Sequence, residues 1–136
     1  MSLENVEIAR RMFELWNAGD VDCWLQCWHG DAVWVSEPFA ALDGTARTYR
    51  GHREMRRFPV DVLEGFADLG RIEEPRFRDV GDSVLVLADY RAKAQTGGPE
   101  VSTPMAWLLE LRHGKIARGR DFLDQRQALK AAGLTH

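Results

Sequence analysis

The residue with the clearest capacity for acid–base chemistry is Asp121, which stands in the alternating run 116–123 (IARGRDFL). If this run is a strand, Asp121 shares its face with small residues such as Gly119, and we expect this face to point inward. Burial would raise the pKa of the acid toward the range that is useful for proton transfer. The alternative is a structural ion pair between Asp121 and Arg118 or Arg120.

Three aromatic residues from different predicted strands could line a pocket beside this acid: Trp34, Tyr90 and Trp107. Aromatic walls that carry a polar group suit flat, partly hydrophobic ligands. The hydroxyl of Tyr90 could donate a hydrogen bond to such a ligand. The three tryptophans between residues 16 and 28 have helical spacing, which is more typical of core residues.

Other kinds of site are not favoured by residue spacing. The four histidines share no spacing with a carboxylate that suggests a metal triad. Cys23 and Cys27 are one helical turn apart, and no second pair completes a zinc site. The sequence has neither a glycine-rich phosphate loop nor a nucleophile elbow. We therefore expect no metal and no cofactor.

The length and composition fit a single domain with one core. The chain has 136 residues, of which 45% are hydrophobic and 29% are charged. Eighteen Lys and Arg against 21 Asp and Glu give a net charge of −3, and the basic residues are scattered. This pattern argues against nucleic acid as a partner. No apolar run spans a bilayer and no secretory signal is visible, so we expect a cytoplasmic protein without a membrane partner.

Helices are predicted in the first half of the chain. Apolar residues at helical spacing over 8–16 predict an amphipathic helix, and the Gly19-Asp20 pair ends it and caps a second helix that runs to Trp28. A short strand is predicted over 32–36, followed by a loop that extends to Gly51.

The spacing of apolar residues over 55–69 predicts a third helix, with a kink near Pro59. Beyond it the pattern changes to alternating runs, which predict four strands over 71–79, 83–94, 101–112 and 115–123. The turn signals between them are Gly81-Asp82, Gly97-Gly98 and His113-Gly114.

These strands predict an antiparallel meander, and Asp124 predicts the cap of a short C-terminal helix. Helices followed by a meander indicate an α+β fold, in which the sheet curls over the helices and leaves a pocket at its open end.

Several segments in this order resemble the nuclear transport factor 2-like superfamily, and within it the SnoaL-like and ketosteroid-isomerase-like branch. They are ELWNAGD (14–20), GDAVW (30–34), TYRGHRE (48–54), RHGKI (112–116) and FLD (122–124). The resemblance covers nearly the whole chain and implies a single SnoaL-like domain over 1–136. It implies a cone-shaped barrel made by a curled antiparallel sheet wrapped over three N-terminal helices, with a short C-terminal helix and a deep apolar pocket. This fold hosts isomerases, cyclases, dehydratases, hydrolases and non-catalytic binding modules.

The resemblance also implies positions for site residues. The isomerase base precedes a proline after the first strand, which matches Glu37 before Pro38. Ser36 takes that position if the match is anchored on the start of the strand instead. The isomerase oxyanion hole matches Met12 and Trp107, and neither can stabilise an enolate by a short hydrogen bond.

The SnoaL-like cyclases use an aspartate of the last long strand as acid/base, which matches Asp121. We expect Glu37 to act as a second carboxylate and Tyr90 as a hydrogen-bond donor. Ligand contacts are expected from Met12, Trp34, Phe58, Phe66 and Trp107. The predicted function is cofactor-independent isomerisation, cyclisation or dehydration, as in isomerases and lyases, of a small apolar or aromatic molecule. The alternative is a non-catalytic ligand-binding or dimerisation module.

A homodimer is predicted through the outer face of the sheet, because a convex face with several large apolar residues is expected to be covered. That face would carry Leu85, Leu87, Arg118, Arg120 and Phe122.

Overall fold

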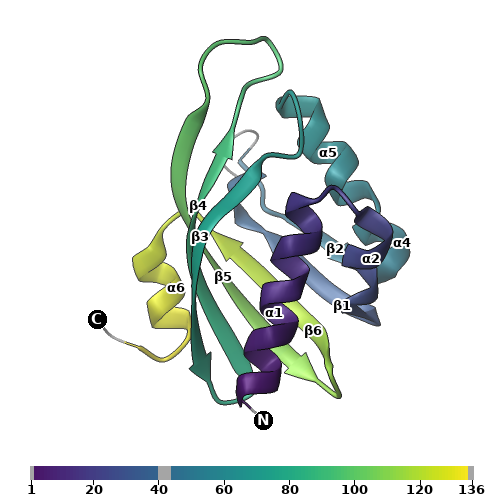
Figure 1. Cartoon of the computed structure of the whole chain (residues 1–136), viewed down its shortest axis with the longest axis vertical. Coiled ribbons are helices and arrows are strands. Elements are labelled where there is room, and N and C mark those ends of the chain that lie inside the picture. The colour runs from purple at the N-terminus through teal and green to yellow at the C-terminus, as the bar shows by residue number, and fades with distance from the viewer. Residues whose placement is uncertain (1, 40–43, 135–136) are drawn as a thin grey trace.

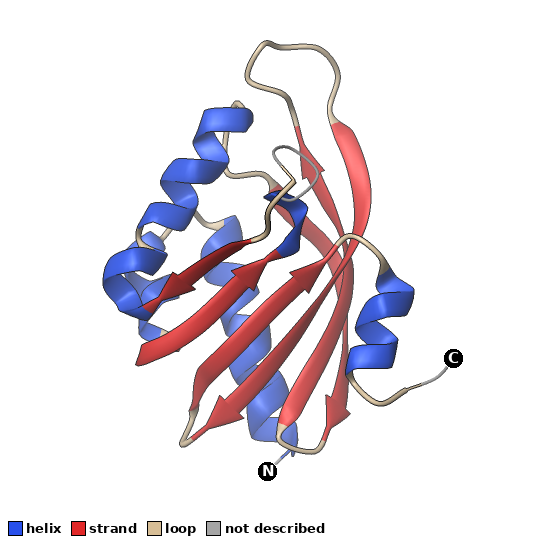
Figure 2. Cartoon of the chain, turned by 180° about the vertical axis from the view of Figure 1, so that it is seen from behind, coloured by secondary structure: helices blue, strands red, loops and turns tan. Residues whose placement is uncertain are grey.

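A computed structural model describes residues 2–39 and 44–134 of the chain and shows an α+β fold with one curled, open sheet (Figures 1 and 2). Its helices are α1 (Ser2–Asn17), α2 (Val21–Gln26), α4 (Gly51–Met55), α5 (Arg57–Gly65) and α6 (Gln125–Ala131), with a short 3-10 helix η1 (Glu37–Phe39). Helix α1 packs on the concave face of the sheet, and α6 packs on the opposite face. None of the helices in these two ranges is long and apolar enough to cross a membrane.

The sheet has six strands in the order β2-β1-β6-β5-β4-β3. They are β1 (Trp28–Ser36), β2 (Arg47–Arg50), β3 (Arg71–Val80), β4 (Ser83–Ala92), β5 (Val101–Arg112) and β6 (Lys115–Phe122). Strands β3 to β6 form the predicted antiparallel meander, and each predicted turn lies in one of its connections. The sheet is not antiparallel throughout, however, because β1 runs parallel to β6.

The prediction for residues 20–51 is wrong in two places. The second helix ends at Gln26 rather than at Trp28, because Cys27 accepts a hydrogen bond from Ile116 and the chain joins the sheet there. Part of the predicted loop forms β2, which pairs with β1. Residues 40–43 of that loop lie outside the described residues.

The predicted third helix is divided into α4 and α5, with the break at Arg56 rather than a kink at Pro59. Pro59 has no N–H to donate to the carbonyl of Met55, four residues earlier, so a continuous helix would lose a hydrogen bond and crowd the ring. Helix α5 ends at Gly65, because Phe66 is extended and forms a β-bridge with Ala94.

Helix α6 covers part of the outer face of the sheet. Its Ala128 packs in a cluster with Leu85 and Phe122, which are 1% and 2% exposed. The sequence pattern predicts that these two residues are exposed in the monomer and covered by a second copy, and this prediction is wrong. The homodimer itself stays a prediction.

Candidate functional site

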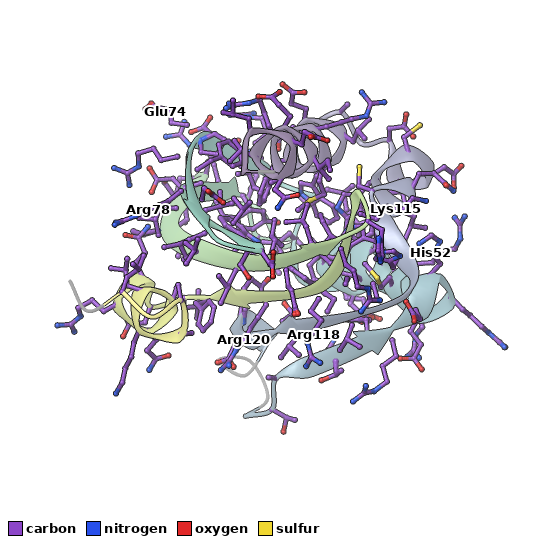
Figure 3. The ribbon with its side chains drawn as sticks, turned by 90° about the horizontal axis from the view of Figure 1, so that it is seen from below. His52, Glu74, Arg78, Lys115, Arg118 and Arg120 are labelled. Carbon is purple, nitrogen blue, oxygen red and sulfur yellow. The ribbon has the colours of Figure 1, made fainter. Side chains whose placement is uncertain are left out.

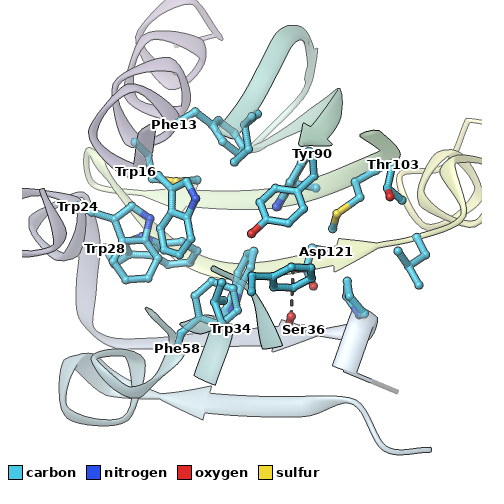
Figure 4. Close-up of a pocket in the computed structure, with 18 residues that line it drawn as sticks. Phe13, Trp16, Trp24, Trp28, Trp34, Ser36, Phe58, Tyr90, Thr103 and Asp121 are labelled. Atoms are coloured by element: carbon cyan, nitrogen blue, oxygen red, sulfur yellow. Dashed lines mark hydrogen bonds between the residues drawn. The ribbon is translucent and has the colours of Figure 1, made fainter. Parts of the chain in front are cut away.

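A cavity of about 240 Å³ lies between the concave face of the sheet and the helices that cover it (Figure 4). Its wall is mainly aromatic, with Phe13, Trp16, Trp24, Trp28, Trp34, Phe58, Phe66, Tyr90 and Trp107. The polar lining residues are Ser36, Thr103 and Asp121, besides the Tyr90 hydroxyl. No Lys, Arg or His is among the described lining residues. The cavity is therefore an apolar space with one acid in its wall.

Strand β6 brings Asp121 to the cavity, as the alternation in the sequence predicts. Gly119 shares this face and lies beneath Trp34, whereas Arg120 points to the outer side. The alternation fails at Ile116, which packs in the main core although strict alternation with Arg118 and Arg120 would place it on the outer face. The reason is a β-bulge, since the register with β5 shifts between Ile116 and Arg118. The extra residue in β6 moves the side chain of Ile116 to the opposite face of the sheet from the one that alternation predicts.

Asp121 is 3% exposed and is held by two hydrogen bonds. The hydroxyl of Ser36 donates to its Oδ2 at 3.1 Å, drawn as a dashed line in Figure 4, and the backbone N–H of Glu37 donates to its Oδ1 at 3.0 Å. The parallel register of β1 and β6, which sets Ser36 opposite Asp121, produces both contacts.

Burial raises the pKa of Asp121 to about 7. Desolvation of the charged form is the main cause, and it outweighs the hydrogen bonds from Ser36 and Glu37, which lower the pKa. The negative charge of Glu37 raises it further. The acid can therefore give and take a proton near neutral pH.

The other carboxylate, Glu37, does not line the cavity. Its Oε1 lies 2.7 Å from Nη2 of Arg120 on the outer side of the wall. The ion pair with Arg120 that was the alternative role for Asp121 is thus formed by Glu37 instead. Of the two residues considered for the isomerase base position, Ser36 points into the site and Glu37 points away from it.

Tyr90 lines the cavity, but its hydroxyl donates to the carbonyl of Leu69 at 2.7 Å. Burial raises its pKa, so the phenol stays protonated. Gly70 makes this position possible: its φ is +75°, and a Cβ there would lie 2.5 Å from the tyrosine ring. With its proton engaged by Leu69, the hydroxyl presents an acceptor to the cavity rather than the donor that was predicted.

All five predicted ligand contacts, Met12, Trp34, Phe58, Phe66 and Trp107, line the cavity. Trp28 and Trp34 pack edge to face with ring centroids 5.2 Å apart. The indole N–H groups of Trp16, Trp28 and Trp34 are buried and have no hydrogen-bond partner among the described residues. These three donors are therefore enclosed within the packed rings and are not exposed to the cavity.

Sequence reasoning missed Ser36 as the partner of Asp121 and Trp16, Trp24 and Trp28 as wall residues. The helical spacing of the tryptophans suggested a core role, and they have it, but the core borders the cavity. Within residues 2–39 and 44–134, no group of three His, Cys, Asp or Glu side chains could hold a metal ion.

A family model of the SnoaL-like domain matches residues 9–119. The chain belongs to the SnoaL-like family. The matched segment of this SnoaL-like protein covers most of the cavity wall and ends two residues before Asp121. The assignment of a role to Asp121 therefore depends on its geometry. No curated protein matches the sequence.

Solved structures share the fold at low sequence identity. A nuclear transport factor 2-like protein of unknown function from Burkholderia pseudomallei has a TM-score of 0.79 and 21% identity, over 93% of this chain and 95% of that one. TerC, co-crystallised with polyporic acid, has a TM-score of 0.79 and 22% identity, over 96% and 98%. A protein with a ketosteroid isomerase-like fold from Catenulispora acidiphila, in complex with trimethylamine, has a TM-score of 0.75 and 18% identity, over 94% and 93%. At these identities the likeness establishes the fold of this SnoaL-like protein and nothing about its substrate.

Proposed function

We propose that this SnoaL-like protein binds a small, uncharged, apolar or aromatic molecule and transfers a proton on it, with Asp121 as the acid/base. The observation that carries the proposal is the position of a buried carboxyl group, with a pKa of about 7, in the wall of an otherwise apolar cavity. A solvated aspartate stays ionised at neutral pH and is a poor acid.

The cavity wall supports an uncharged ligand. An anionic ligand would have no cation to pair with among the described lining residues, and it would be repelled by an ionised Asp121. The aromatic rings favour a flat molecule.

The proposed chemistry needs no cofactor. The ionised carboxylate of Asp121 takes a proton from a carbon next to a ligand carbonyl, and the electron pair of that C–H bond moves to the carbonyl oxygen as the enolate forms. The protonated acid then returns the proton to the same carbon, to another carbon or to a leaving hydroxyl. These three outcomes correspond to exchange, isomerisation and dehydration.

We expect the protein to accelerate exchange of the α-hydrogens of 2-tetralone, a flat and uncharged ketone, in D₂O at pD 7.5. Asp121→Asn should slow the catalysed exchange about 100-fold, because a positioned base contributes roughly 10²–10⁴ to such a step. Proton NMR measures the exchange rate directly. Asp89→Asn is the matched control, because Asp89 is exposed on β4 and should leave the rate unchanged.

A non-catalytic ligand carrier is the second candidate. It is favoured by one observation: the hydroxyl of Tyr90 already donates its hydrogen bond to the carbonyl of Leu69, so the predicted donor is not free to stabilise an enolate oxygen. Quenching of the tryptophan fluorescence by 2-tetralone, together with an exchange rate equal to that of buffer, would establish the carrier and refute the enzyme.

A further inference from the structure

The outer side of the wall behind Asp121 carries an ion pair that the proposed chemistry does not use. Arg120 and Glu37 face each other across strands β6 and β1, with Nη2 and Oε1 2.7 Å apart. Figure 3 shows Arg120 and its neighbour Arg118 extending from the same side of the sheet, the side opposite to α1. The side chains of Arg120 and Glu37 are 49% and 30% exposed. Exposed ion pairs of this kind usually stabilise a fold only weakly, so a contribution to stability does not explain why this pair is present.

Glu37 acts on both sides of this wall. Its backbone N–H donates to Oδ1 of Asp121 inside the site, at 3.0 Å, whereas its carboxylate binds Arg120 outside. The parallel ladder between β1 and β6 ends at the pair of Ser36 and Asp121, so Glu37 is the first residue beyond it. The ion pair therefore links β6, through Arg120, to Glu37, the residue whose backbone N–H donates to the carboxyl group of Asp121.

The same guanidinium of Arg120 makes a second contact. Its guanidinium lies over the ring of Phe122, 4.7 Å from the centroid, and Phe122 is 2% exposed in the cluster under α6. A cation over an aromatic face is attracted to the ring. A series of contacts thus connects the hydrophobic cluster beneath α6 to the carboxyl group of Asp121, through Phe122, Arg120 and Glu37.

We propose that the ion pair of Arg120 and Glu37 is a positioning device for Asp121, in which Arg120 holds Glu37 so that its backbone N–H stays in contact with the carboxyl group. Arg120 is a positioning residue, since it reaches the site only through Glu37. This inference rests on the proposed function, because a positioned carboxyl group matters only if Asp121 transfers protons.

The proposal can be tested because Glu37 affects the pKa of Asp121 in two opposite ways, through its backbone N–H and through the charge of its carboxylate. The N–H of Glu37 lowers the pKa of Asp121, and the Glu37 carboxylate raises it. Removal of the carboxylate charge alone would therefore lower the pKa, whereas a weakened N–H contact would raise it. The other groups that face Asp121 are Ser36 of β1, which donates to it, and the phenol of Tyr90 of β4, which stays protonated.

The experiment compares the wild-type protein with Arg120→Gln, Glu37→Ala and the control Arg118→Gln by NMR. Arg118 is an exposed arginine two positions away on the same strand, and it is outside the chain of contacts. Two quantities are followed: the pKa of the Asp121 carboxyl carbon and the hydrogen-exchange protection of the amide at position 37. We expect Arg120→Gln to raise the pKa by roughly 0.5–1 and to reduce the protection at least about 10-fold. Glu37→Ala should likewise reduce protection and not lower the pKa, and Arg118→Gln should change neither quantity.

The outcomes separate this proposal from the proposed function. A raised pKa in the wild-type protein with both quantities unchanged in Arg120→Gln would overturn the positioning role and leave the proton-transfer function standing. Equal changes in Arg118→Gln would also overturn it, since a general effect of surface charge would then explain them. A lowered pKa in Glu37→Ala with full amide protection would show that Glu37 acts by charge alone. An unshifted pKa in the wild-type protein would instead contradict the proposed function.

Discussion

Replacement of Asp121 by asparagine should stabilise the folded protein at pH 8 by up to about 4 kcal/mol and leave its stability at pH 4 nearly unchanged. Asparagine has almost the shape of the protonated acid and never carries its charge. It can still accept the N–H of Glu37, and it does not need to be desolvated as an anion. The variant therefore escapes the cost of ionising a carboxyl group that is 3% exposed.

The sign follows from the direction of the pKa shift. Burial raises the pKa of Asp121 from 3.8 to about 7, so the folded state binds the proton more tightly than the unfolded state. The contribution of the group to stability is complete below the unfolded pKa, and it is lost as the pH rises from about 4 to about 7. Above pH 7 both states are ionised and the loss is constant.

Urea unfolding, followed by tryptophan fluorescence at pH 4, 6 and 8, measures this difference. The stability of Asp121→Asn relative to the wild-type protein should increase over that range, whereas the exposed control Asp89→Asn should show a small difference that does not change with pH. A variant that is less stable than the wild-type protein at pH 8 would mean that the hydrogen bonds to the carboxylate outweigh its burial.

A cost of this size is a large fraction of the 5–15 kcal/mol by which domains are usually stable. An apolar residue or an asparagine would fill the position at lower cost, so the presence of the acid needs a reason other than stability. Proteins typically retain such local conflicts at functional sites. The stability measurement therefore bears on function even before a substrate is known.

Much of the sheet could be predicted because the signals for its strands and turns lie within short stretches of the sequence. The alternation in β4, β5 and β6 and the glycine turns between them correctly placed the four strands of the meander. The same alternation placed Asp121 on the inner face. It failed at Ile116, because the sequence does not mark the bulge that inverts the strand there.

The contacts of Asp121 could not be predicted, because they depend on long-range register. Ser36 lies 85 residues from Asp121 in sequence, and only the parallel pairing of β1 with β6 makes them neighbours. A shift of one residue would have placed Glu37 in the cavity instead. The sequence left these two possibilities open for the same reason. Which face α6 covers is likewise decided by tertiary packing rather than by the pattern of the helix itself.

Replacement of Gly119 by alanine should destabilise the protein by about 3 kcal/mol, because two tryptophan rings occupy the space of the new methyl group. A Cβ at this position would lie 2.6 Å from Cε3 of Trp34 and 2.8 Å from Cη2 of Trp28. Both rings are buried, at 3% and 0% exposed, and each packs against further aromatic rings. Neither can move without disturbing that packing, so the strain cannot be relieved by rotation of one flexible side chain.

The matched control is Gly30→Ala, in β1, where a Cβ would meet nothing within 4 Å. We expect its stability to stay within about 0.5 kcal/mol of the wild-type value. Urea unfolding measures both variants, and the fluorescence of the native state reports displacement of the rings. Movement of Trp34 toward the cavity should also weaken fluorescence quenching by 2-tetralone in Gly119→Ala and leave it unchanged in Gly30→Ala. Equal stability of the two variants would contradict this prediction, because it would show that the rings of Trp28 and Trp34 can be displaced at little cost in free energy.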